Sequence, residues 1–217
     1  MSAQTSDVAT CLRSAEELKA EGNEHFRAGR WKEALGVYRS GLGELQQGTD
    51  TTQDPRNAED AEDEPNPTTK LDKDCSKARA ILHANIAACC VKLGEHKEAV
   101  EACTQALSDD PEYLKALQRR ASSNEILGTW SSLSAAQEDY NTLLKILPES
   151  DSRRHGVSSA LQQLKPRIEA SQKRETAEML DKLKGVGNNI LGRFGLSTDN
   201  FQFVPNAQGG YSMNFTR

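Results

Sequence analysis

Apolar and polar residues alternate along most of this chain with the three- to four-residue period of amphipathic helices. Glycine interrupts the pattern at Gly29, Gly94 and Gly128, and each interruption separates two helical stretches. Pro111 and Pro148 follow the second and third pairs of stretches, where a helix is expected to stop. The pattern therefore predicts an all-α fold in which six helices form three pairs. The predicted helices are 16–28, 31–47, 78–93, 97–107, 112–127 and 134–147.

Two segments lack this periodicity, and we expect both to be disordered. Residues 1–12 are small and polar. Residues 49–74 are acidic, contain three prolines and have Leu71 as their one apolar side chain larger than alanine. Such a segment cannot bury enough apolar surface to offset the entropy that it would lose on folding. The sequence therefore predicts a disordered N-terminus and a disordered acidic insertion, 49–75.

The last third of the chain departs from the paired pattern. A long charged helix is predicted over 153–184. We expect the segment 150–184 to cap the last pair, because stacked helix pairs need a shielded end. The segment 185–217 is rich in glycine and phenylalanine. Aromatic and polar residues alternate on both sides of 206–210, which predicts a short helix followed by a small β-hairpin.

Composition and charge narrow the possible classes of protein. Charged residues make up 27% of the chain and aromatics 5%, so the core must consist mainly of small aliphatic side chains, which suits layered helices. The formal net charge of −5 argues against a general nucleic-acid binder, which needs a basic surface. No apolar run approaches the roughly 20 residues of a membrane span. The five cysteines are irregularly spaced and follow no secretory signal, which favours reduced thiols and a cytoplasmic protein.

The helix pairs also repeat one another in detail. The motif Trp31-Lys-Glu-Ala34 matches His96-Lys-Glu-Ala99, and each motif begins two residues after the glycine of its turn. These spacings resemble those of the tetratricopeptide repeat (TPR) family. The resemblance implies a three-repeat TPR superhelix over 13–149, with a groove lined by the first helix of each pair. About three extra residues in 130–135 predict an irregular turn in the third pair.

Five polar residues occupy related places on the predicted first helices. Lys19 and Asn23 are one turn apart and share a face. Asn85 lies among apolar residues, and Lys115 and Arg119 are again one turn apart. The set resembles the carboxylate clamp of TPR co-chaperones, whose pattern is Lys-x3-Asn, then Asn, then Lys-x3-Arg. The resemblance implies that these residues bind the C-terminal Glu-Glu-Val-Asp of Hsp70 or Hsp90 chaperones.

The chemistry of the five side chains suits that ligand. Two lysines and an arginine neutralise the two carboxylates at the end of such a tail, and two asparagines donate hydrogen bonds without adding charge. The alternative is that these are ordinary solvated surface residues, and Asn23 could instead serve helix packing beside Gly22.

The C-terminal sequence indicates a narrower relationship. The stretches Leu183–Asn188, Phe194–Gln202 and Gly210–Phe215 resemble the end of the tetratricopeptide repeat protein 1 family. Two functions are then open. The first is a co-chaperone adaptor that binds a chaperone tail and brings in an unknown client. The second is a signalling or assembly scaffold that contacts its partners mainly through the C-terminal segment.

No motif in the chain points to an enzyme. The four histidines lack metal-ligand spacing with one another and with the cysteines. Cys89 and Cys90 are adjacent within an apolar helix, which favours a place in the core. The glycines at Gly185, Gly187 and Gly192 are not followed by the Lys-Ser/Thr of a phosphate-binding loop. We therefore expect a protein that is not an enzyme and that needs no cofactor or metal.

Overall fold

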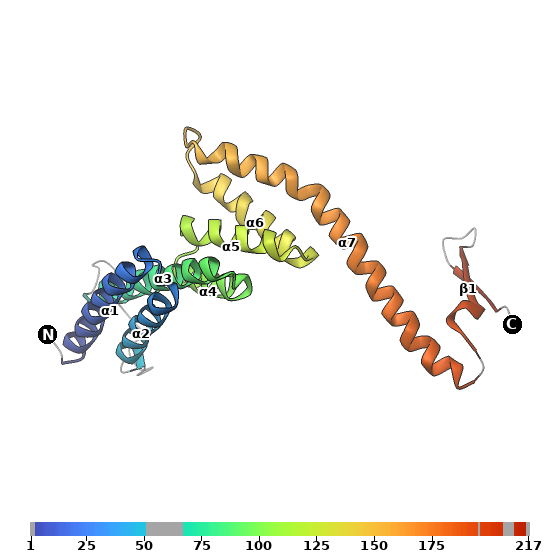
Figure 1. Cartoon of the computed structure of the whole chain (residues 1–217), viewed down its shortest axis with the longest axis horizontal. Coiled ribbons are helices and arrows are strands. Elements are labelled where there is room, and N and C mark those ends of the chain that lie inside the picture. Colours follow the sequence, from blue (N-terminus) through green and yellow to red (C-terminus); the bar gives the residue numbers. More distant parts are fainter. Residues whose placement is uncertain (1–2, 51–66, 195, 206–210, 216–217) are drawn as a thin grey trace, which may run out of the picture. The chain divides into compact units, whose positions relative to one another are not determined.

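The computed structural model describes residues 3–50, 67–194, 196–205 and 211–215 (Figure 1). The chain divides into two compact units, Met1–Lys165 and Pro166–Arg217. The first unit contains six complete helices and the beginning of a seventh, α7, which continues into the second unit. The helices are α1 Ala3–Arg27, α2 Trp31–Asp50, α3 Pro67–Leu93, α4 His96–Asp109, α5 Leu114–Leu127, α6 Trp130–Ile146 and α7 Arg153–Gly192.

The helices of the first unit form three stacked pairs. Each helix packs against its partner, α1 on α2, α3 on α4 and α5 on α6. Neighbouring pairs are joined by contacts of α2 with α3 and of α4 with α5. The first helices also contact one another, α1 with α3 and α3 with α5. The side chains on these three helices can therefore form one continuous surface.

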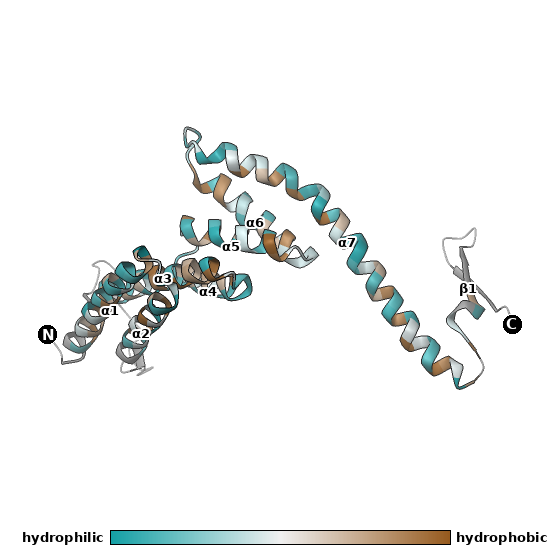
Figure 2. Ribbon diagram, viewed as in Figure 1, coloured by the Kyte–Doolittle hydropathy of each residue, from teal (hydrophilic) through white to brown (hydrophobic). Residues whose placement is uncertain are grey.

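Small residues make the core of the first unit. Figure 2 shows hydrophobic residues interspersed with hydrophilic ones along each helix, as the amphipathic pattern requires. Ala34, Ala99 and Ala136 are fully buried in the second helices of the three pairs. Four residues later in each helix, Tyr38, Cys103 and Tyr140 are also buried. Alanine lets two helices approach closely, and the larger residue one turn later fills the space beside the contact.

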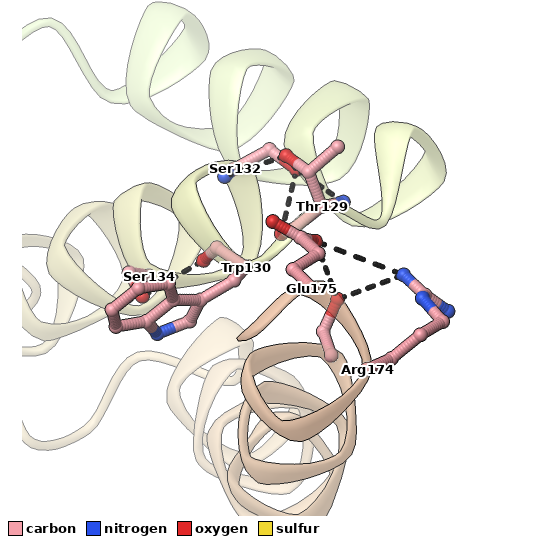
Figure 3. Close-up of polar contacts among 7 residues, drawn as sticks. Thr129, Trp130, Ser132, Ser134, Arg174 and Glu175 are labelled. Carbon is pink, nitrogen blue, oxygen red and sulfur yellow. Dashed lines mark hydrogen bonds and ion pairs between the residues drawn. The ribbon is translucent and has the colours of Figure 1, made fainter. Parts of the chain in front are cut away.

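The turns within the pairs depend on left-handed glycine. Gly29, Gly94 and Gly128 have φ of 75°, 79° and 66°, a conformation that side chains with a Cβ rarely adopt. After Gly128, Thr129 caps α6: its Oγ1 accepts from the backbone N–H of Ser132 at 3.1 Å, and Ser132 Oγ accepts from the N–H of Thr129 at 2.9 Å (Figure 3). The prediction of an irregular third turn is wrong, because α6 begins two residues after Gly128, as α4 does after Gly94.

The N-terminus is more ordered than the sequence analysis predicts. Helix α1 begins at Ala3, so the prediction of disorder over 1–12 is wrong for residues 3–12. Val8 is 6% exposed and Ala15 is 1% exposed, two turns apart on the same helix. The physical reason is that a single buried valine continues the apolar face of α1 about two turns beyond the segment that looks amphipathic.

The acidic insertion is shorter in the structure than predicted. Residues 51–66 lie outside the described residues, so the prediction of disorder is not tested there. Helix α2 continues to Asp50 and α3 begins at Pro67, so the prediction of disorder is wrong for 49–50 and 67–75. Proline is well tolerated in the first turn of a helix, where its missing N–H has no partner to lose. Cys75 and Leu82 are both buried and lie seven residues apart, which places them on one face of α3.

Helix α7 starts as a cap on the first unit. The Arg154 guanidinium donates to the backbone carbonyls of Leu144 and Leu147, which α6 leaves without helical partners. Val157 and Leu164 are buried. Helix α7 continues to Gly192, so the long helix ends later than residue 184, where it was predicted to end.

The second unit ends in a short helical turn and two strands. The 3₁₀ turn η1, Thr198–Asn200, lies against α7, where Asn188 Oδ1 accepts from the Thr198 N–H at 2.6 Å and from Ser197 Oγ at 3.2 Å. Strands β1 Phe201–Pro205 and β2 Tyr211–Phe215 pair antiparallel, with Phe201 opposite Phe215. The predicted turn of the hairpin, 206–210, lies outside the described residues.

Candidate functional site

The five residues singled out from the sequence lie on the first helices of the three pairs. Lys19 and Asn23 are on α1, Asn85 is on α3, and Lys115 and Arg119 are on α5. Because α1 contacts α3 and α3 contacts α5, the polar residues of these three helices lie on neighbouring helices. We call this set of five residues the A-helix site.

Three members of the A-helix site form a connected row. Asn85 Nδ2 donates to Asn23 Oδ1 at 3.4 Å, which links α3 to α1. The Arg119 guanidinium donates through Nη1 to the backbone carbonyl of Ala84 at 3.0 Å, which links α5 to α3. Ala84 directly precedes Asn85, so the guanidinium lies beside the asparagine pair. All three side chains are partly buried, and their positions are set by contacts within the chain.

The two lysines are held more loosely. Lys19 Nζ lies 3.9 Å from Glu16 Oε1, one turn earlier on α1, and the lysine side chain is 25% exposed. Lys115 is exposed and forms no ion pair with any other described residue. Both lysines are one helical turn from a member of the connected row. Their ammonium groups can therefore reach a ligand bound over that row without a change of backbone.

A tyrosine outside the predicted set of five contacts the A-helix site. Tyr38, on α2, donates its hydroxyl to Asn23 Oδ1 at 2.7 Å. Burial raises the pKa of Tyr38 to about 12, although the nearby cations Arg27 and Arg119 oppose the shift. The phenol is therefore protonated at neutral pH and acts as a donor. Many apolar residues could fill the space that Tyr38 occupies. The choice of a residue with a hydroxyl at this position is the one signal in the sequence that could have revealed its contact with Asn23.

Two ion pairs that the sequence analysis missed hold the pairs behind this site. Arg120 binds Asp139 with two hydrogen bonds, of 2.6 and 2.9 Å, and joins α5 to α6. Arg79 binds Asp109 at 2.7 Å and joins α3 to α4. The residue next to Arg120 is Arg119, so adjacent arginines have different surroundings: one pairs with a carboxylate between two helices, and the other donates to a backbone carbonyl at the site.

The four buried cysteines offer no reactive thiolate near the site. Burial raises the pKa of Cys89 to about 11 and that of Cys103 to about 12. Burial also raises the pKa of Cys75 and Cys90. All five cysteines are free thiols. Within the described ranges, no three histidine, cysteine or acidic side chains are grouped as metal ligands would be, and no helix has the length and apolar character needed to cross a membrane.

Comparison with known proteins identifies relatives over the helical region. No protein-family model matches the chain. The mitochondrial import receptor subunit TOM34 of Rattus norvegicus is 35% identical over 133 residues, which are 61% of this chain and 35% of that protein. TOM34 of Homo sapiens is 33% identical over 145 residues, 67% of this chain and 38% of that protein. The chain therefore spans little more than a third of the length of the curated relatives it matches.

Solved structures share the fold at low sequence identity. The C-terminal TPR-containing domain of a Plasmodium falciparum FK506-binding protein has a TM-score of 0.57 at 19% identity, covering 76% of this chain and 95% of that domain. Yeast Tom70 has a TM-score of 0.51 at 24% identity, covering 76% of this chain and 26% of Tom70. The helical region of this chain thus has the tetratricopeptide-repeat fold, and its sequence is similar to part of TOM34.

Proposed function

We propose that this protein is a non-enzymatic co-chaperone adaptor. Its first unit, a three-repeat TPR superhelix, binds the acidic C-terminal Glu-Glu-Val-Asp tail of Hsp70 or Hsp90 in a two-carboxylate clamp. The clamp is the A-helix site, Lys19, Asn23, Asn85, Lys115 and Arg119. The observation that carries the proposal is the connected row of Asn23, Asn85 and Arg119 across three neighbouring helices.

The donors of the row match what a chain terminus offers. A terminal carboxylate and the side chain of the last aspartate present two anions, and the site supplies three cations and two neutral amides. Charge-assisted hydrogen bonds contribute roughly 1.5–3 kcal/mol each. A few such bonds, reduced by the cost of ordering a flexible tail, correspond to a dissociation constant in the roughly micromolar range. The site is a local cationic surface on a chain whose formal net charge is −5.

Titration calorimetry with a short peptide ending in Glu-Glu-Val-Asp tests the clamp. We expect Lys115→Ala and Arg119→Ala each to weaken binding at least tenfold, and amidation of the peptide terminus to weaken it similarly. Lys97→Ala is the matched control, because Lys97 is an exposed lysine on α4, the second helix of its pair. Binding should also weaken with added salt, because exposed charges are screened. Affinity that survives both Arg119→Ala and amidation would refute the clamp.

Several finer expectations belong to the same proposal. Resemblance of the C-terminal sequence supports membership of the tetratricopeptide repeat protein 1 family. The composition and cysteine usage support a cytoplasmic location without nucleic-acid binding or membrane insertion. The pairing of β1 with β2 supports the small C-terminal hairpin, which would dock either on the capping helix or on a client whose identity is unknown. No cofactor is part of the proposed function.

A second candidate function is an assembly scaffold that uses the C-terminal segment, and one observation favours it. In the second unit, Met179, Leu183, Val186 and Ile190 follow the 4-3-4 spacing of a helix-pairing seam, and they are 59% to 71% exposed. The scaffold would present this seam to an amphipathic helix of its partner. Under the scaffold function, Leu183→Lys abolishes partner binding and Arg119→Ala leaves it unchanged. Under the clamp function, Arg119→Ala abolishes binding of a chaperone and Leu183→Lys leaves it unchanged.

A further inference from the structure

The surroundings of Tyr38 fix the position of its hydroxyl. Its side chain is 1% exposed, and the ring lies against Gly22 of α1. A Cβ at residue 22 would lie 2.5 Å from Tyr38 Cε1, so only glycine allows this close approach. Because the ring has no room to turn away, its hydroxyl is held next to the residue that follows Gly22, which is Asn23.

The hydrogen bonds at Asn23 select one orientation of its amide. Asn23 Oδ1 accepts from the Tyr38 hydroxyl at 2.7 Å and from Asn85 Nδ2 at 3.4 Å. An amide oxygen has two lone pairs, so these two donors satisfy it fully. Rotating the amide by half a turn would replace this oxygen by an NH₂ group facing the NH₂ of Asn85. Two donors that face each other lose a hydrogen bond and repel, so the observed orientation is strongly preferred.

The selected orientation leaves the donor side of Asn23 available. Among the described residues, no acceptor is bound to Asn23 Nδ2, and Lys19 lies one turn away on the same helix. A carboxylate accepts hydrogen bonds and cannot donate them. An Asn23 side chain turned the other way would present its oxygen to the carboxylate, which would repel it. The Asn85 amide selects this orientation, and the shorter hydrogen bond from the Tyr38 hydroxyl holds the Asn23 amide in it, so that Asn23 attracts an anionic ligand.

We propose that Tyr38 is a positioning residue for the carboxylate site: its hydroxyl holds Asn23, and through Asn23 also Asn85, in the orientation that donates to a peptide carboxylate. This inference rests on the proposed function of the A-helix site. It adds a residue on α2, which the clamp pattern on the first helices does not include.

Tyr38→Phe tests the role, because it removes the hydroxyl and keeps the ring that packs on Gly22. We expect the affinity for a peptide ending in Glu-Glu-Val-Asp, measured by calorimetry, to fall about three- to tenfold, the loss typical of one hydrogen bond. Tyr140→Phe is the matched control. Tyr140 donates to Glu125 Oε1 at 2.6 Å across the same 15-residue separation in the third pair, outside the site. Loss of the Tyr140 hydroxyl should leave the affinity for the peptide unchanged.

A double-mutant cycle separates positioning from a general loss of stability. In an Asn23→Ala background, adding Tyr38→Phe should have no further effect on affinity, because the amide that Tyr38 orients is gone. A loosened fold would weaken binding equally in both backgrounds. A wild-type chain that does not bind the peptide overturns the proposed function itself. A wild-type chain that binds, with a Tyr38→Phe chain that binds equally well, overturns only the role of Tyr38.

Discussion

Gly22→Ala is the substitution for which the structure makes the sharpest prediction of stability. The new methyl group would lie 2.5, 2.7 and 3.0 Å from three ring carbons of Tyr38, far inside the usual contact distance of roughly 3.5–4.0 Å. The ring is buried and cannot swing into solvent. Overpacking of this kind costs about 1–3 kcal/mol, and the higher helix propensity of alanine returns about 0.5–1 kcal/mol. We expect a net destabilisation of about 1–2 kcal/mol.

Gly36→Ala provides the comparison that isolates the clash. Gly36 lies inside α2 and is exposed, and apart from the nearby backbone of its own helix no atom lies within 4 Å of the position a Cβ would take. Only the gain in helix propensity applies there, so this variant should be stabilised by about 0.5–1 kcal/mol. The two variants make the same chemical change and should move in opposite directions. Equilibrium unfolding in urea measures the difference, with a shift in Tm of roughly 2–4 °C per kcal/mol as a second measurement.

The result that would refute this reasoning is specific. If Gly22→Ala is as stable as Gly36→Ala, the ring of Tyr38 does not lie against α1 as closely as the structure places it. The fixed position of its hydroxyl would then lose its physical basis as well. A destabilised Gly22→Ala chain should also bind peptide more weakly, because the displaced ring carries the hydroxyl away from Asn23.

Three other measurements follow from the contacts of the first unit. Arg120→Ala leaves the Asp139 carboxylate, which is 3% exposed, without its partner. The free energy of unfolding, measured in urea, should fall by about 3 kcal/mol, and an unchanged urea midpoint would contradict a structural role for the pair. Glu16→Gln removes the acid that lies 3.9 Å from Lys19, and should tighten peptide binding by about twofold at low salt, with no gain at high salt. Burial raises the pKa of Cys103 from 9.0 to about 12, so the unfolded thiol ionises first. The contribution of this thiol to stability should be constant below about pH 9 and fall above it, and Cys103→Ala should reduce the slope of the urea midpoint against pH above pH 9.

The paired helices could be predicted because their signals are local. Gly29, Gly94 and Gly128 each take a left-handed φ, and a sequence can display that requirement directly. The helix ends could not be predicted as well, since a single buried residue such as Val8 or Cys75 extends an apolar face without creating a visible period. Whether such a residue is buried depends on the helix that packs over it, and this is a property of the tertiary structure.

The site shows the same division between local and tertiary information. The places of Lys19, Asn23 and Arg119 on first helices follow from helical spacing and from the repeat. The hydrogen bond from Tyr38 to Asn23 joins two helices, and its geometry depends on the absence of a side chain at Gly22. From the sequence alone, Asn23 is either a ligand-binding residue or a packing residue beside Gly22. In the structure, the contact of Gly22 with Tyr38 is what orients Asn23, so packing and the proposed binding depend on each other.

The proposed clamp contains side chains that are held by hydrogen bonds within the chain and side chains that are not. The two kinds predict a different dependence of peptide affinity on salt concentration. Asn23, Asn85 and Arg119 are oriented by bonds within the chain, so binding a peptide orders them little further. Lys19 and Lys115 contribute charge from flexible stems, and salt screens exposed charges most effectively. Removing a lysine should therefore reduce the salt dependence of peptide affinity. Removing Asn23 should lower the affinity by a similar factor at every salt concentration, because a neutral amide at short range is not screened.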